Sequence, residues 1–288
     1  MSEAIVAQPG LLAAFRRAAS IALSAYVLEP DAAVTKALED AGDRGARVSV
    51  RLEGSPYAGR EPSGDLAERN GRVVAELRAH GVAVHLTTAG DLPVHMKAAL
   101  VDGVAYLDDR NWPADGLDTI FATSDADDVA AVTSALRGDP AADGHLAGEK
   151  RAALRLEAQT ISAARGDQID VESESFGYSA VSKALYERAR RGAHVRLLVA
   201  KREFDEGGAT ERAALRRLAG VGVEVRVVPN DEKLCSAGDR GWIGSANATY
   251  EPAAMLDWGM ETRRPALLRG IEAAFERNWA CSRPAALG

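Results

Sequence analysis

The sequence contains two copies of one pattern, and this internal repeat constrains the fold more than any other feature. AAVTKAL begins at Ala32 and SAVSKAL begins at Ser179, while RGARV at Arg44 recurs as RGAHV at Arg191, both 147 residues later. HGVAV in the first copy matches VGVEV in the second. A repeat this long describes two copies of a whole folding unit and not a solenoid.

Helix-type and strand-type patterns alternate along the chain. Alternating apolar residues predict strands over residues 21–27, 47–52 and 80–86. Apolar residues at helical spacing predict helices over residues 11–20, 31–41 and 66–79. Residues 138–149, rich in Gly, Asp and Ala, indicate a linker, and an amphipathic stretch over 150–164 opens the second copy. We expect an α/β protein with one repeat over residues 1–144 and another over residues 145–288, each a mixed sheet flanked by helices.

A predicted hairpin over residues 95–112 holds an uncommon set of polar side chains. His95 and Lys97 are two residues apart, so on an extended chain both leave the same face of a strand. Asp102 and the glycine after it predict a tight turn. The returning strand is expected to bring Asn111 back beside His95 and Lys97.

The second copy of this hairpin keeps part of the set. Lys233 and Asn247 follow Lys97 and Asn111 at the same spacing of 136 residues, without a gap. Asp231 stands where the first copy has its histidine, and Gly238 stands where it has its turn aspartate.

His95, Lys97 and Asp102 fit the pattern H-x-K-x-x-x-x-D, and residues 244–247 read G-S-A-N. This signature resembles that of the phospholipase D superfamily of phosphodiester-cleaving enzymes, and the resemblance covers nearly the whole chain. It implies two repeats packed about a pseudo-twofold axis, with both motif copies building one active site. The match is incomplete, because two aspartates replace the G-S pair in the first copy and the second copy lacks its histidine.

These residue types suit a phosphodiester substrate. A neutral imidazole nitrogen of His95 can attack phosphorus to give a phosphohistidine, while ammonium and amide groups stabilise the charge on the non-bridging oxygens. The scheme requires neither a metal nor another cofactor. Family enzymes use the second histidine as the general acid; here Asp231, Glu232 or a bound water has to take that role. The phosphate-binding candidates are Lys97, Asn111, Lys233, Ser245 and Asn247, and the structural members of the motif are Asp102 and Gly244.

A carboxylate that orients the nucleophilic imidazole is also expected, as in other histidine-dependent sites. The resemblance places an acidic residue shortly after the motif. Asp118 and Asp257 occupy matching places there, and Glu261 lies four residues beyond Asp257. All three are candidate orienters.

Composition limits the classes of function. The 288 residues are 47% hydrophobic, with a net charge of −7, which argues against an unselective coat on nucleic acid. The first 144 residues have 13 basic and 22 acidic side chains, and the rest have 22 and 20. No apolar run approaches the roughly 20 residues of a membrane span. We expect a cytoplasmic, soluble monomer with an internal pseudo-dimer and two reduced cysteines.

Three functions remain open. A phosphodiesterase acting on nucleic acid is favoured by the absence of a membrane-binding stretch. A phospholipid hydrolase or phosphatidyltransferase is expected to show an amphipathic or apolar entry surface. An inactive phosphate-binding protein is the third possibility, motivated by Asp231 and Gly238.

Overall fold

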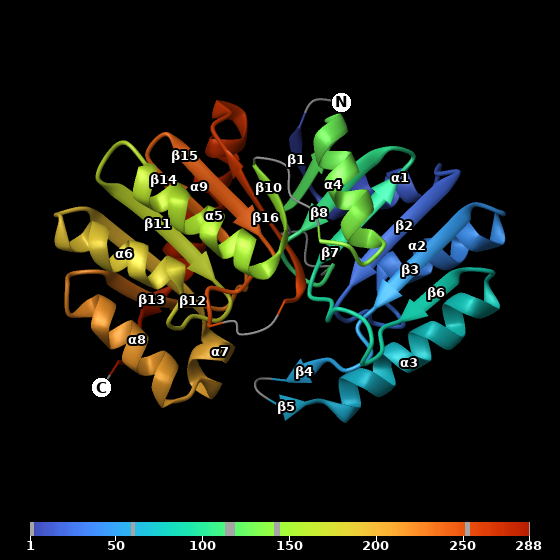
Figure 1. Cartoon of the computed structure of the whole chain (residues 1–288), viewed down its shortest axis with the longest axis horizontal. Helices are drawn as coiled ribbons and strands as arrows, with labels where there is room; N and C mark the ends of the chain where they lie inside the picture. Colours follow the sequence, from blue (N-terminus) through green and yellow to red (C-terminus); the bar gives the residue numbers. More distant parts are fainter. Residues whose placement is uncertain (1–2, 59–60, 113–118, 141–144, 251–253, 288) are drawn as a thin grey trace. The chain divides into compact units, whose positions relative to one another are not determined.

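The structure is a computed structural model that describes residues 3–58, 61–112, 119–140, 145–250 and 254–287. The chain divides into two compact units (Figure 1). The first unit comprises Met1–Asp143 and Ala254–Trp258, and the second comprises Gly144–Ala253 and Gly259–Gly288.

The described part of the first unit contains a seven-stranded sheet in the order β1-β9-β8-β7-β2-β3-β6. β2, β3 and β6 are parallel, whereas β7, β8, β9 and β1 continue the sheet as antiparallel neighbours. The strands are β1 (Ala4–Val6), β2 (Ser20–Ala25), β3 (Arg47–Leu52), β6 (Ala83–Leu86), β7 (Lys97–Val101), β8 (Val104–Asp108) and β9 (Ile120–Thr123). β4 (Tyr57–Ala58) and β5 (Glu61–Pro62) form a separate two-stranded ribbon.

Four described helices pack on this sheet: α1 (Gln8–Phe15), α2 (Ala33–Asp43), α3 (Gly64–Ala79) and α4 (Ala126–Leu136). α2 contacts both α1 and α3, α2 contacts β3 and α3 contacts β6, whereas α4 contacts β2, β7 and β8. Ser63 caps α3 by accepting a hydrogen bond from the backbone of Leu66, and Asp125 caps α4 through Asp127. Alternate residues of β2 and β3, such as Leu23 and Val50, are buried in the core between sheet and helices.

The second unit repeats this plan around an eight-stranded sheet in the order β10-β16-β15-β14-β11-β12-β13-β17 among its described residues. β11, β12 and β13 are parallel, and β14, β15 and β16 are antiparallel neighbours. The strands are β10 (Leu146–Glu149), β11 (Gln168–Ser173), β12 (His194–Ala200), β13 (Glu224–Val228), β14 (Leu234–Ala237), β15 (Arg240–Gly244), β16 (Leu256–Thr262) and β17 (Arg283–Pro284).

The described helices of the second unit form two groups. α5, α6 and α8 pack side by side, and α9 contacts β11, β13, β14 and β15 (Figure 1). Ser179 and Ser182 form a reciprocal capping box at the start of α6. The helices are α5 (Lys150–Ala163), α6 (Ala180–Arg190), α7 (Lys201–Glu206), α8 (Ala209–Ala219) and α9 (Pro265–Cys281).

The expected α/β class and its two tandem repeats of mixed sheet and helices are confirmed. The predicted linker over residues 138–149 is wrong at its end, because Leu146–Glu149 forms strand β10. Glu149 then caps α5 by accepting hydrogen bonds from the backbone of Arg151 and Ala152. The Gly and Asp residues of this stretch indicate a turn, and composition alone does not reveal the short strand β10 that follows. Within the described ranges, no helix is both long and apolar enough to cross a membrane.

Candidate active site

His95 is joined to Asp257 within the first unit. The backbone N–H of Leu256 donates to the carbonyl of Pro93, and the N–H of His95 donates to the carbonyl of Leu256, both at 2.8 Å. This local pairing brings Asp257, the next residue, beside the imidazole. Asp257 Oδ2 lies 3.1 Å from His95 Nδ1, and its other oxygen accepts a hydrogen bond from the backbone of Trp258. The Asp257 side chain is fully buried, and that of His95 is 14% exposed.

Lys97 and Tyr26 complete the cluster around the imidazole. Lys97 Nζ lies 3.0 Å from His95 Nε2 and 3.2 Å from Nδ1, and its side chain is buried. The same ammonium lies 5.7 Å from the centre of the Tyr26 ring, within cation–π range. Tyr26 also packs edge-on against His95, with ring centres 5.0 Å apart. Tyr26 was missed in the sequence analysis because its position in the second repeat holds a different type of residue.

The contacts of the cluster favour one tautomer of the imidazole. Asp257 accepts a hydrogen bond best from a protonated Nδ1, and this tautomer leaves the lone pair on Nε2. Nε2 then accepts from the Lys97 ammonium, which can transfer its hydrogen bonds to an arriving phosphate oxygen. The arrangement combines an oriented imidazole with a cation beside it.

Asp108, the first of the two aspartates that replace the family's G-S pair, stabilises a turn of the backbone. Asp108 is buried and accepts hydrogen bonds from the backbone N–H groups of Arg110 (3.0 Å) and Trp112 (2.6 Å). Its carbonyl accepts from Trp258 Nε1 at 2.8 Å. These bonds hold the turn after β8, where Trp112 has a positive φ of 52°. Asn111 lies on this turn and is exposed, and within the described part of the chain no hydrogen bond joins it to His95.

Asp102 lies at the tip of the β7–β8 hairpin, with φ of 46°. Its carboxylate accepts hydrogen bonds from the backbone of Ala19 (3.1 Å) and Ser20 (2.8 Å), which ties the hairpin to the start of β2. Gly238 holds the matching place in the second repeat, where an added Cβ would lie 1.8 Å from the carbonyl oxygen of Arg165. The neighbouring Asp239 takes over by accepting from the backbone of Arg165 at 3.0 Å. Asp102 thus holds the backbone at the start of β2 in place.

The second unit presents its motif residues differently. Lys233 is 1% exposed and forms an ion pair with Glu174 at 3.0 Å. The Asn247 amide donates to the same carboxylate at 3.1 Å, and its carbonyl accepts from the backbone of Ser175 at 3.2 Å. Glu174 therefore occupies the two donors that the resemblance assigned to phosphate. Ser245 lies two residues before Asn247 and is fully buried, and Gly244 is the last residue of β15.

The strand registers identify which residues of the two repeats occupy equivalent positions. Ser24 pairs with Ala98 across β2 and β7, and Glu172 pairs with Leu234 across β11 and β14. Two residues further on, Tyr26 of the first repeat therefore corresponds to Glu174 of the second. An aromatic ring faces the motif lysine in one unit, and a carboxylate neutralises it in the other.

A pair of buried acids also distinguishes the second unit. Asn278 Nδ2 donates to Glu172 Oε2 at 2.9 Å and to Glu232 Oε2 at 3.1 Å. Burial, followed by the nearby Glu232, raises the pKa of Glu172 well above its ordinary value. The equivalent residues of the first repeat are Ser24 and Met96, so the acids are specific to the second.

The remaining predicted residues lie in the second unit or outside the described ranges. Glu261 accepts from Arg240 Nη1 at 2.7 Å and from Arg263 Nε at 3.2 Å, whereas Asp257 is the carboxylate that contacts His95 within the first unit. Asp118 lies outside the described residues. Asp231 is half-buried, and its carbonyl accepts from Lys233 Nζ at 3.1 Å.

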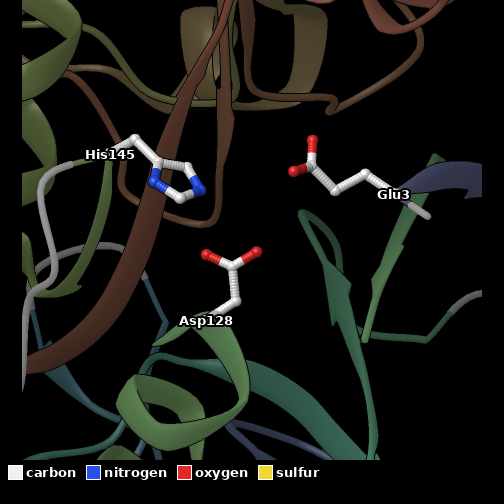
Figure 2. Close-up of side chains that lie close together, drawn as sticks. All are labelled: Glu3, Asp128 and His145. Atoms are coloured by element: carbon white, nitrogen blue, oxygen red, sulfur yellow. The ribbon is translucent and has the colours of Figure 1, made fainter. Parts of the chain in front are cut away.

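Three other side chains of metal-ligating type are Glu3, Asp128 and His145 (Figure 2). Glu3 immediately precedes β1, and Asp128 lies in the first turn of α4, where it accepts a hydrogen bond from Thr123 Oγ1 at 2.8 Å. His145 belongs to the second unit and Glu3 and Asp128 to the first, so we assign no metal site to them.

Comparison with known proteins gives one family and several folds. The family model "Cardiolipin synthase, PLD-like domain" matches residues 158–279. Phosphatidylserine synthase from Haemophilus influenzae Rd KW20 has a TM-score of 0.68 at 10% identity, over 99% of this chain and 87% of that one. Polyphosphate kinase from Porphyromonas gingivalis has a TM-score of 0.65 at 20% identity, over 96% of this chain. This chain spans half the length of that kinase. A search of curated protein sequences gives no match.

The solved structures establish the fold, and the family match lies in the second repeat, whose motif is the less complete. The first repeat supplies the intact H-x-K-x-x-x-x-D residues. The strand order β9-β8-β7-β2-β3-β6 of its sheet corresponds to the order β16-β15-β14-β11-β12-β13 in the second repeat. The second repeat thus matches a phospholipase D-like family model over residues 158–279, and the whole chain shares the fold of the phosphatidylserine synthase.

Proposed function

We propose that the protein cleaves phosphodiester bonds through a covalent phosphohistidine at His95, with a nucleic-acid strand as the favoured substrate. The observation that carries this proposal is the His95 cluster of the first unit. Asp257 holds Nδ1 at 3.1 Å and the Lys97 ammonium lies 3.0 Å from Nε2. This is the geometry required of an oriented nucleophile with an adjacent cation.

The first step forms one bond and breaks one. The lone pair of His95 Nε2 attacks phosphorus, a P–N bond forms, and the bond to the leaving oxygen breaks. Asp257 stabilises the positive charge that develops on the ring, and Lys97 donates to a non-bridging oxygen. In the second step a water oxygen attacks phosphorus, and its proton passes to the group that protonated the leaving oxygen. The P–N bond breaks, its electron pair returns to Nε2, and the imidazole regains its resting tautomer.

The leaving oxygen requires a proton in the first step unless it is a weak base. We propose that Asp231, which stands at the histidine position of the second repeat, or a bound water supplies it. Family enzymes use a histidine in this role, and the second repeat has none at this position. Turnover is therefore expected to be slow with alkyl leaving groups.

A second candidate is transfer of a phosphatidyl group. It is supported by the description of the matched family and by the fold shared with a phosphatidylserine synthase. The same His95 chemistry applies, with a lipid alcohol or serine as the acceptor in place of water. Substrate choice therefore separates the two candidates.

The test is a substrate screen of the full chain with EDTA present, against bis(p-nitrophenyl) phosphate, single- and double-stranded DNA, RNA and phosphatidylcholine. Reactions with labelled substrate, quenched with detergent at alkaline pH, should give an adduct that is stable in alkali and lost in acid. His95→Asn, which keeps a hydrogen bond to Asp257, should remove both turnover and adduct. The matched control is His194→Ala, a change at an exposed histidine on β12. Turnover that persists in His95→Asn would reject the assigned nucleophile, and cleavage of the lipid alone would reject the favoured substrate.

A further inference from the structure

The second unit has a groove between α6 and α8 that plays no part in the chemistry above. It encloses a cavity of about 700 Å³. Its floor includes the buried side chains of Ala214 and Leu218 on α8. α6 contributes positions 183, 186, 187 and 190, which share one face because they follow helical spacing. The α6 helix has 11 residues, so the groove can extend for about 16 Å along it.

The walls of the groove are basic. Its four cations are Lys183, Arg190, Arg191 and Arg217, and its one carboxylate is Glu187. All five side chains belong to exposed residues. None of the four cations forms an ion pair with another described residue. The groove therefore has a local charge of +3 on a chain of net charge −7, and electrostatics favours an anionic ligand there.

An aromatic side chain lies against two of the guanidinium groups. Arg217 lies 4.5 Å and Arg190 lies 6.0 Å from the centre of the Tyr186 ring. Stacking on a ring satisfies the face of a guanidinium and leaves the N–H groups at its edge for an anion. Tyr178, at the other end of the groove, is 41% exposed and offers a second ring face.

The first repeat provides an internal comparison. α2 and α6 correspond residue by residue at a spacing of 147, so Glu39 and Asp43 match Tyr186 and Arg190. The backbone N–H of Val82 donates to the carbonyl of Leu77, as that of Val223 donates to the carbonyl of Leu218. This equivalence places Glu76 at the position of Arg217. The fold requires neither the basic nor the aromatic residues of the groove, because the first repeat has acids at all three places.

We infer that this groove binds single-stranded nucleic acid, with arginine contacts to phosphates and a base stacked on Tyr178 or Tyr186. Stacked aromatic rings combined with a basic channel are the features by which proteins hold single strands without sequence preference. A duplex is too wide to reach a floor set between two packed helices, whereas splayed bases can enter it. A bilayer surface cannot reach the floor of a concave site either, and its binding would rest on protruding apolar groups.

The test uses the full chain carrying His95→Asn, so that binding is measured without cleavage and independently of the proposed function. The probe is fluorescein-labelled dT20, followed by fluorescence anisotropy at several salt concentrations. Arg190→Asp with Arg217→Glu installs the residues of the first repeat at these positions. We expect at least a tenfold weaker affinity, and a salt slope smaller by about 1.4, which is the effect of two lost phosphate contacts on a single strand. Tyr186→Leu should weaken binding while leaving the salt slope unchanged.

Arg269→Asp with Arg277→Glu is the matched control, because it changes the charge equally at exposed positions of α9. This control should bind dT20 like the parent. Equal loss in both double variants would show that only net charge matters and would overturn the site. Tighter binding of a duplex of the same length, or binding only to vesicles of phosphatidylcholine and phosphatidylglycerol, would overturn the assigned ligand. Unchanged circular dichroism and melting temperature in both double variants exclude misfolding as the cause.

Discussion

His95 Nδ1 and Asp257 Oδ2 lie 3.1 Å apart in the first unit although 162 residues separate them in the sequence. Asp257→Asn keeps the shape of this contact but can donate to Nδ1 and so favour the wrong tautomer. We expect kcat to fall by about 10²- to 10⁴-fold with a much smaller change in KM. Steady-state kinetics on bis(p-nitrophenyl) phosphate measures the two parameters. Glu261→Gln, which alters a carboxylate bound to arginines instead, serves as the comparison and should leave kcat within a factor of a few.

Asp231→His restores the family's second histidine. If position 231 supplies the proton for the leaving oxygen, this change should raise cleavage of an alkyl or nucleic-acid phosphodiester by at least tenfold. It should leave the nitrophenyl substrate almost unaffected, because nitrophenolate needs no proton to leave. Parallel rate measurements on both substrates decide the matter. No gain in Asp231→His, together with no loss in Asp231→Ala, would remove position 231 from the acid role.

Glu174 neutralises Lys233 and accepts from Asn247 in the second unit. Glu174→Gln leaves the buried ammonium with a weaker partner, so we expect the free energy of unfolding to fall by about 1–3 kcal/mol. Without the negative charge of Glu174 beside it, the Lys233 ammonium should attract an anion more strongly. Inorganic phosphate should therefore raise the melting temperature of Glu174→Gln more than that of the parent. Equal phosphate shifts in both proteins would contradict this account of the second repeat.

Glu172 makes stability depend on pH. Because burial and the neighbouring Glu232 raise its folded pKa well above its ordinary 4.5, the folded state holds a proton that the unfolded state has already released. The stabilisation is complete below the ordinary value and is lost as pH rises through the raised folded pKa. The slope for one proton is about 1.4 kcal/mol per pH unit in that window.

Glu172→Gln removes this proton linkage while it can still accept from Asn278. We expect its unfolding free energy to exceed that of the parent toward alkaline pH and to vary less with pH above the ordinary carboxyl pKa of 4.5. Urea unfolding at a series of pH values gives both curves. Glu187→Gln, at an exposed position of α6, is the control and should follow the parent curve.

Local patterns predicted much of the fold. Strand β3 occupies Arg47–Leu52 as alternation indicated, and the hairpin of β7 and β8 turns at Asp102 and Gly103. These features depend on neighbours in sequence, where periodicity is informative. The short strands β1 and β10 were not predicted, because three or four residues that complete a sheet edge carry too little periodicity.

The sequence could rank Asp257 among the orienters but could not choose it, because the choice depends on the pairing of residues 93–95 with Leu256. Tyr26 and Glu174 were hidden for another reason. The repeat spacing is 148 residues across β2 and β11 but 147 across α2 and α6, so one extra residue in the first copy interrupts the match just where these two positions lie. Only the strand registers align them.

The assignment of Ala254–Trp258 to the first unit has a consequence for synthesis of the chain. A ribosome that has delivered the first 143 residues has not yet made the segment that pairs with Pro93 and His95. At about 5–20 residues per second, the remaining segment follows several seconds later. His95 thus emerges early and acquires its carboxylate partner late. A gene cut between the repeats would encode a first fragment with His95 but without Asp257, the residue that contacts its imidazole.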